Sequence, residues 1–101
     1  MLQHYVFLKY REATSAAHVA TFCERMLGLR ATIPGIRHLE IGRDELHDSR
    51  SWDLVLIMRF DSVESLRAYQ AHDAHQAVMA FNEPFVASVA SIDFFAGRES
   101  P

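Results

Sequence analysis

The order of hydrophobic and polar positions divides the chain into segments with the periods of strands and helices. Residues 2–10 alternate imperfectly and are rich in aromatic and branched side chains, which predicts a strand. Its two faces carry Leu2, His4, Val6 and Leu8 on one side and Tyr5 and Phe7 on the other. Both faces are largely apolar, so we expect helices to cover one of them and a second subunit to cover the other.

A helix is predicted after this strand. Thr14 and Ser15 offer hydroxyl groups for its N-cap, and the apolar residues that follow recur at the spacing of one helical stripe. That stripe consists of Val19, Phe22, Cys23, Met26 and Leu27. The Pro34-Gly35 pair predicts that the helix has ended by this point, because both residue types interrupt helices.

Two further strands and a loop are predicted next. Ile36, Leu39 and Ile41 indicate a short strand over residues 36–43. The polar residues up to Ser51 predict an exposed loop, which would form either a lid over a pocket or the rim of a dimer. Residues 52–60 are the most strand-like segment, and their unbroken apolar stretch is typical of a central strand buried on both faces.

Two capping-box patterns predict two consecutive helices. Asp61 with Glu64 marks the start of the first, and Asp73 with Gln76 marks a second that would begin near residue 74. The inward-facing residues would be Val63, Leu66 and Tyr69 in the first helix and Val78, Met79 and Phe81 in the second. Pro84 would kink or end the second helix.

A last strand at Val89–Phe95 completes the order β-α-β-β-α-(α)-β. This order predicts an α+β, ferredoxin-like fold with a four-stranded antiparallel sheet and helices on one face. A chain of 101 residues forms one domain of this kind, which we place at residues 1–96, followed by a flexible tail over 97–101.

Composition and charge then narrow the function. The net charge of -3 and the single lysine, Lys9, argue against nucleic-acid binding. No apolar run reaches the roughly 18 residues of a membrane span, so no membrane partner is expected. The chain opens without a basic secretory leader, and its one cysteine, Cys23, forms no internal disulfide, which favours a soluble cytoplasmic protein.

The densest group of chemically competent side chains lies between Ala68 and Gln76. This stretch holds Tyr69, His72 and His75 at the seam between the two predicted helices. His75 has the properties of a general base, and Tyr69 those of a donor to a substrate carbonyl or enolate. Alternatively, the same groups form a buried polar network that only stabilises the fold.

The other candidate groups are weaker. His72 lies just before the second helix, where an exposed or capping position is the simpler interpretation. His72 and His75 have the spacing of two metal ligands, but no third ligand follows at suitable spacing, so we predict no metal site. Cys23 lies in an apolar stripe and is interpreted as a small core residue. The remaining histidines are assigned to the surface, at His18, His38 and His47.

Taken together, several segments resemble the stress-responsive A/B barrel (Dabb) family. They are His4 in the first strand, the turn 33–36, the strand 52–61, the stretch 66–76 and Ile92-Asp93-Phe94. The resemblance implies a dimeric α+β barrel, in which two sheets pack through their helix-free faces. The family usually has proline where this chain has Asp73, and aspartate suits a helix N-cap as proline suits a first turn.

The resemblance also implies a chemistry. One branch of the family, the plant polyketide cyclases, condenses a linear polyketide by an intramolecular aldol reaction without a cofactor. By this likeness the catalytic residues are Tyr69 and His75, with His4 as a pocket residue and Asp93 orienting His75. Two pocket positions differ, because a tyrosine and a histidine of that branch are replaced here by Met26 and Leu54, which predicts a more apolar pocket.

The sequence therefore leads to two hypotheses. The first is a cofactor-independent, homodimeric enzyme that uses His75 and Tyr69 as an acid-base pair on a small carbonyl or phenolic, polyketide-like compound. The second is a non-catalytic dimeric ligand-binding or stress-response protein with a structural His-Asp-Tyr network. Haem-dependent monooxygenases and muconolactone-isomerase-like enzymes share the dimeric α+β barrel and form a third possibility.

Overall fold

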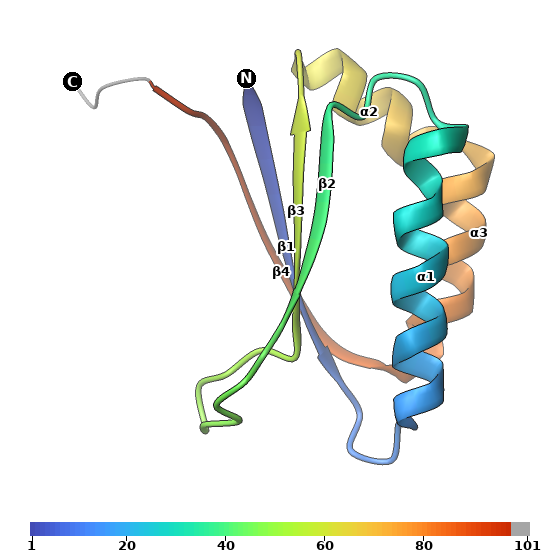
Figure 1. Ribbon diagram of the computed structural model, residues 1–101, viewed down its shortest axis with the longest axis vertical. Helices are drawn as coiled ribbons and strands as arrows, with labels where there is room; N and C mark the ends of the chain where they lie inside the picture. Colours follow the sequence, from blue (N-terminus) through green and yellow to red (C-terminus); the bar gives the residue numbers. More distant parts are fainter. Residues whose placement is uncertain (98–101) are drawn as a thin grey trace.

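The computed structural model describes residues 1–97, so most of the tail predicted at 97–101 lies outside the described residues. Its elements follow the predicted order, with a turn of 3₁₀ helix, η1, before the last strand (Figure 1). They are β1 (Leu2–Tyr10), α1 (Ala16–Thr32), β2 (His38–Arg43), β3 (Leu54–Phe60), α2 (Val63–Ala71), α3 (Asp73–Asn82), η1 (Glu83–Phe85) and β4 (Val86–Phe95).

The four strands form one antiparallel sheet in the order β2-β3-β1-β4, and the helices cover one of its faces (Figure 1). This is the predicted ferredoxin-like fold. The register places His4 of β1 beside Met58 of β3 on one side and Asp93 of β4 on the other. None of the helices within residues 1–97 is long and apolar enough to cross a membrane.

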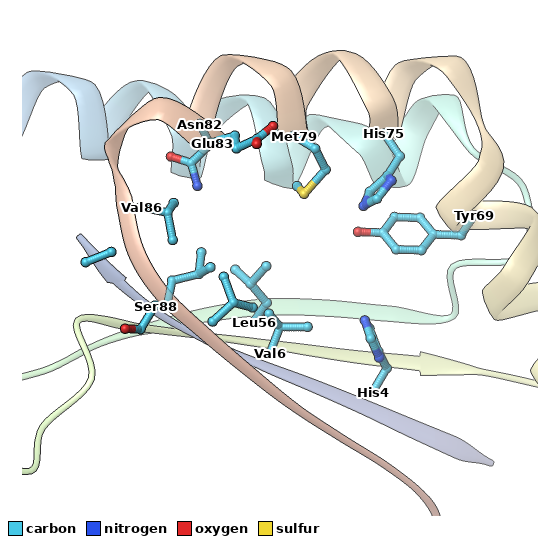
Figure 2. Close-up of a pocket in the computed structure, with 13 residues that line it drawn as sticks. His4, Val6, Leu56, Tyr69, His75, Met79, Asn82, Glu83, Val86 and Ser88 are labelled. Carbon is cyan, nitrogen blue, oxygen red and sulfur yellow. The ribbon is translucent and has the colours of Figure 1, made fainter. Parts of the chain in front are cut away.

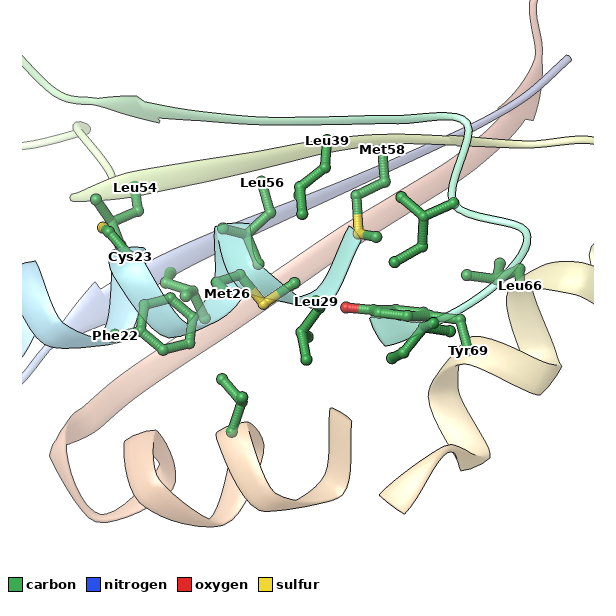
Figure 3. Packing of buried hydrophobic residues seen from close by; sticks show 14 of the residues in the cluster. Phe22, Cys23, Met26, Leu29, Leu39, Leu54, Leu56, Met58, Leu66 and Tyr69 are labelled. Atoms are coloured by element: carbon green, nitrogen blue, oxygen red, sulfur yellow. The ribbon is translucent and has the colours of Figure 1, made fainter. Parts of the chain in front are cut away.

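The core lies between the sheet and α1, where Phe22, Met26 and Met58 are fully buried (Figure 3). Phe60 of β3 is fully buried as well. The predicted stripe of α1 is correct for Phe22, Cys23 and Met26 but wrong at its end. Leu27 is 48% exposed, and Leu29 is buried in its place. The helix continues through Thr32, so its last turn presents Leu29 rather than Leu27 to the sheet.

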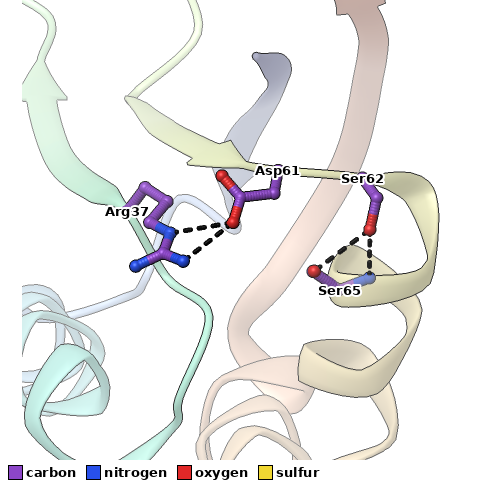
Figure 4. Close-up of polar contacts among 4 residues, drawn as sticks. All are labelled: Arg37, Asp61, Ser62 and Ser65. Carbon is purple, nitrogen blue, oxygen red and sulfur yellow. Dashed lines mark hydrogen bonds and ion pairs between the residues drawn. The ribbon is translucent and has the colours of Figure 1, made fainter.

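Both predicted capping boxes are corrected by the structure. The N-cap of α2 is Ser62, whose Oγ accepts a hydrogen bond from the Ser65 N–H at 3.1 Å, while Asp61 binds Arg37 (Figure 4). The N-cap of α3 is His72, whose Nδ1 accepts from the Ala74 N–H at 3.0 Å. In both cases the cap is the residue next to the predicted aspartate, and the interpretation of His72 as a capping residue is confirmed.

The cap assignment of α2 gives a direct test. Ser62→Ala is expected to lower the free energy of unfolding by about 1 kcal/mol, because it leaves the first turn of α2 without its side-chain acceptor. Urea unfolding monitored by circular dichroism measures this loss. Asp61→Ala is the control and should cost less, since the Arg37–Asp61 pair is solvent-exposed and screened. A larger loss for Asp61→Ala than for Ser62→Ala would restore the capping box that the sequence predicts.

The helix-free face of the sheet is apolar and carries aromatic pairs. The rings of Tyr5 and Phe94 lie 5.6 Å apart and those of Phe7 and Trp52 lie 6.2 Å apart. Ile92, beside Tyr5 in the register, is 54% exposed in the single chain. When one face of an antiparallel sheet is exposed to solvent, that face usually carries polar residues. The apolar residues on this face therefore indicate that another surface covers it.

Candidate functional site

A cavity of about 370 Å³ lies between the helix-covered face of the sheet and α3 (Figure 2). One end carries His4, Tyr69 and His75, and the middle is apolar. The lining residues are His4, Val6, Leu8, Leu56, Tyr69, His75, Met79, Asn82, Glu83, Val86, Ala87, Ser88 and Val89. Met26 and Leu54 are buried in the core and do not line it. The loop predicted as a possible lid contributes no residue to it either.

His75 faces this cavity from the first turn of α3, and the break at His72 turns its ring back toward α2. Its Nδ1–H donates to the Gln70 carbonyl oxygen at 3.0 Å. This bond leaves Nε2 as the unprotonated nitrogen. Burial lowers the pKa of His75 below its ordinary value, and nearby His4 adds a smaller effect in the same direction. The hydrogen bond to Gln70 raises the pKa but does not offset the effect of burial. His75 is therefore neutral at neutral pH and presents a proton acceptor.

Tyr69 supplies a donor beside this acceptor. Its ring centroid lies 4.4 Å from that of His75 and 6.5 Å from that of His4. The side chain is 2% exposed, and burial raises its pKa well above the ordinary value, so the phenol stays protonated. Within residues 1–97 the hydroxyl has no hydrogen-bond partner. Every side-chain nitrogen or oxygen that is fully buried in this range has a partner, so the Tyr69 oxygen is not fully buried. The Tyr69 hydroxyl therefore opens onto the cavity.

The prediction that Asp93 orients His75 is wrong. Asp93 Oδ1 instead accepts a hydrogen bond of 2.5 Å from Nδ1 of His4, its neighbour across the β1–β4 pairing. The His4 ring turns its other nitrogen toward Tyr69 and His75 (Figure 2). The structure thus brings His4, Tyr69 and His75 to one end of the cavity, with Asp93 behind His4. The ring of His75 is oriented by the backbone carbonyl of Gln70 and not by Asp93.

The other candidates lie outside this group. His72 caps α3 and does not line the cavity. Cys23 is buried in the core, as predicted. His18 was assigned to the surface, but it is half-buried, and its Nε2–H donates to Asn82 Oδ1 at 2.9 Å. Within residues 1–97 no three His, Cys, Asp or Glu side chains are grouped as metal ligands.

Asn82 is the cavity residue that the sequence prediction missed. It is 3% exposed and closes the end of α3, where Glu83 also lines the cavity. His75, Met79 and Asn82 stand at i, i+4 and i+7, which places them on one face of a helix. That spacing, started from His75, is the signal that would have found it.

Comparison with known proteins gives a family and a set of related structures. The family model described as the stress-responsive A/B barrel domain, Dabb, matches residues 2–96. This chain belongs to the Dabb family. No curated protein matched its sequence.

Solved structures share the fold of this Dabb domain over most of its length. A dimeric ferredoxin-like protein of unknown function from Bacteroides fragilis is 25% identical, covers 92% of this chain and 93% of that one, and has a TM-score of 0.82. A dimeric ferredoxin-like protein from Thermobifida fusca is 22% identical, with coverages of 92% and 88% and a TM-score of 0.83. A hydroxynitrile lyase from Passiflora edulis is 13% identical, with coverages of 99% and 96% and a TM-score of 0.87.

The lowered pKa of His75 predicts how the stability of the Dabb domain depends on pH. Between the folded pKa and the unfolded value of about 6.5, the unfolded chain binds a proton that the folded chain does not. The contribution of His75 is thus complete above the unfolded pKa and is lost as pH falls through the folded pKa. Urea unfolding should show a steeper loss across this window for the wild type than for His75→Gln.

A matched control separates this effect from general acid sensitivity. His47 has a side chain that is 76% exposed and a positive φ of 54°, a conformation that asparagine tolerates. His47→Asn removes only the exposed contact with Asp44, at 3.5 Å, and should therefore change the pH dependence less than His75→Gln does. Equal slopes for the wild type and His75→Gln would contradict a lowered pKa at His75.

Proposed function

We propose that this Dabb domain is a cofactor-independent enzyme that moves a proton at a carbon next to a carbonyl group. The substrate would be a small carbonyl or phenolic compound, polyketide-like in having oxygen groups on a hydrocarbon frame. The proposal is carried by one observation: a neutral imidazole nitrogen and a protonated phenol, neither engaged by another residue within 1–97, share one end of an apolar cavity.

The proposed step balances without another reagent. Nε2 of His75 takes the proton, the C–H electrons form a C=C bond, and the carbonyl electrons move to oxygen to give an enolate. The Tyr69 O–H donates a hydrogen bond to that oxygen, where the charge develops. His4 and Asp93 lie on the other side of Tyr69. With its Nδ1–H donated to Asp93, the His4 nitrogen that faces the cavity would accept a hydrogen bond from a hydroxyl group of the substrate.

The test uses a simple ketone as a substrate probe. Nonan-2-one in deuterium oxide exchanges its protons next to the carbonyl when a base removes them, and proton NMR follows the loss of their signal. The proposal predicts saturable exchange by the wild-type protein above the buffer rate. If nonan-2-one binds in the cavity but exchanges only at the buffer rate, the protein is a ligand-binding module, which is the second hypothesis.

The fold permits enzymatic use, since one structure that shares it is named a hydroxynitrile lyase. At 13% identity this likeness concerns the fold, and no substrate is transferred from it. The binding-module alternative is favoured by a different observation. His4 and Asp93 are direct neighbours across paired strands, and such a short pair stabilises the sheet whether or not a ligand is present.

We further infer that the chain forms a homodimer through the helix-free face of its sheet. The Bacteroides fragilis and Thermobifida fusca proteins of this fold are described as dimeric. The residues that would meet across the interface include Tyr5, Phe7, Ile92 and Phe94, which are only partly covered or exposed in the single chain. An antiparallel sheet with two apolar faces needs cover on both.

A charge on this face should prevent dimer formation. Ile92→Glu is expected to shift the protein from dimer to monomer, because the interface would bury an unpaired carboxylate. Light scattering coupled to gel filtration measures the mass directly. Leu27→Glu is the matched control, since Leu27 is similarly exposed, at 48%, but lies on α1 on the other side of the molecule. A monomeric wild type, or a dimeric Ile92→Glu, would contradict the inference.

A further inference from the structure

Asn82 is a polar residue of the cavity wall and is almost fully buried, at 3% exposure. Its Oδ1 accepts two hydrogen bonds from two different elements. One comes from the Tyr10 hydroxyl of β1 at 2.7 Å, and the other from Nε2–H of His18 on α1 at 2.9 Å. Two donors on the oxygen fix the orientation of the amide.

This orientation directs the amide nitrogen into the cavity, as Figure 2 shows. Burial raises the pKa of Tyr10 to about 12, so its hydroxyl keeps the proton that it donates to Oδ1. Within residues 1–97 the nitrogen Nδ2 has no hydrogen-bond partner. Every fully buried side-chain nitrogen in this range has a partner, so Nδ2 is not fully buried. Nδ2 therefore opens onto the cavity as a positioned, unused donor.

We propose that Asn82 is a specificity-determining residue that donates a hydrogen bond from Nδ2 to a second oxygen of the substrate. This inference rests on the proposed function and deepens it by naming the substrate class. Asn82 follows His75 by seven residues on α3, about 10 Å along the helix axis. The substrate is elongated, with a carbonyl group at His75 and Tyr69 and a second oxygen at Asn82.

The remaining cavity wall fixes two further properties of this substrate. Between the two ends the wall is apolar, formed by side chains such as Val6, Leu56 and Met79, so the linking segment is hydrocarbon. Glu83 lines the end that holds Asn82, and no lysine or arginine among residues 1–97 lines the cavity. A carboxylate there would meet a like charge without a counter-ion. The second oxygen is therefore neutral, a ketone or a hydroxyl group.

The test compares two ketones that differ only in the second oxygen, nonane-2,8-dione and nonan-2-one. The variant is Asn82→Asp, which keeps an oxygen for Tyr10 and His18 but replaces the Nδ2 donor by an acceptor. Isothermal titration gives the ratio of the two dissociation constants for each protein. In Asn82→Asp the preference for the dione is expected to fall by about fivefold to a hundredfold, since its second carbonyl loses its donor.

Two controls accompany this comparison. Ala77→Glu adds the same charge on the exposed side of α3 and should leave the ratio at its wild-type value. The keto acid 8-oxononanoate should bind the wild type more weakly than the dione. Tighter binding of this keto acid would overturn the assignment of a neutral oxygen.

A second measurement needs no variant. Asn82 is the sole asparagine in the sequence, so asparagine-selective nitrogen-15 labelling gives a single side-chain amide signal. The dione should shift this signal and nonan-2-one should shift it much less. Equal shifts from both ketones, or an unchanged binding ratio in a folded Asn82→Asp, would overturn the inference.

The binding measurements at Asn82 and the proton-exchange measurement at His75 can fail independently of each other. If proton exchange of the ketones depends on His75 but the ratio of the two dissociation constants is the same in the wild type and Asn82→Asp, only the inference on Asn82 fails. If the dione shifts the Asn82 signal but no exchange depends on His75, the binding site stands and the proposed catalysis fails.

Discussion

Replacing His75 by alanine is expected to reduce the deuterium exchange of nonan-2-one by about a hundredfold to ten-thousandfold, the usual contribution of a positioned general base. Nε2 of His75 is the unprotonated nitrogen that faces the cavity, since Nδ1–H is held by the Gln70 carbonyl. Removing the ring removes the acceptor and leaves the cavity otherwise intact. The measurement is the rate of loss of the ketone's α-proton signal at saturating ligand.

The neighbouring histidine provides the matched control. His72 belongs to the same stretch of chain but caps α3 and does not line the cavity. His72→Ala should therefore lower the free energy of unfolding by about 1 kcal/mol, a typical cap loss, while leaving the exchange rate close to that of the wild type. Exchange that survives in His75→Ala, or that disappears equally in both variants, would show that His75 is not the base.

Replacing Tyr69 by phenylalanine is expected to lower the exchange rate by about a hundredfold to a thousandfold, as loss of a donor to a developing oxyanion does. Its hydroxyl has no hydrogen-bond partner within residues 1–97, so the folded protein loses no internal bond. Thermal unfolding should therefore be unchanged or slightly raised. This combination of lost exchange and kept stability distinguishes a catalytic phenol from a structural one.

Two other tyrosines calibrate this result. Tyr5 lies on the opposite face of the sheet, and Tyr5→Phe should keep the exchange rate. Tyr10 donates to the buried Asn82, and Tyr10→Phe should reduce stability, because Asn82 Oδ1 loses one of its two donors. If Tyr69→Phe behaves like Tyr10→Phe, with lost stability and unchanged exchange, the polar cluster is structural.

The elements and the main cavity residues were predictable because they follow from local periods. Alternation in residues 2–10 placed His4 on the helix-covered face, and the helical spacing of α2 placed Tyr69 inward. The break between α2 and α3 followed from local capping chemistry. The local sequence was therefore enough to predict that His75 lines the cavity.

The partner of Asp93 was not predictable in the same way. Whether Asp93 meets His4 or His75 depends on the register of β4 against β1, which is set by contacts between the two ends of the chain. The cap errors have a related cause. Asp61 and Ser62 are both suitable cap residues, and the choice was made by Arg37, a residue on another segment that binds Asp61.

The role of Asn82 illustrates a third kind of information. Its sequence context is a helix end before Pro84, which indicates a boundary rather than a site. Only the donors from Tyr10 and His18 fix the direction of its amide, and both come from distant segments. A single polar residue on an apolar helix face is therefore worth testing against the cavity it borders, once that cavity is known.

We expect one carbonyl group of a bound ligand to contact both His75 and Tyr69 in the cavity between α3 and the sheet. Intermolecular nuclear Overhauser effects between bound nonan-2-one and the labelled protein test it most directly. Contacts are expected from the ketone's α-protons to the rings of both His75 and Tyr69. Contacts confined to the larger hollow near Arg43 and Asp44, or an absence of contacts to either ring in the bound complex, would contradict it.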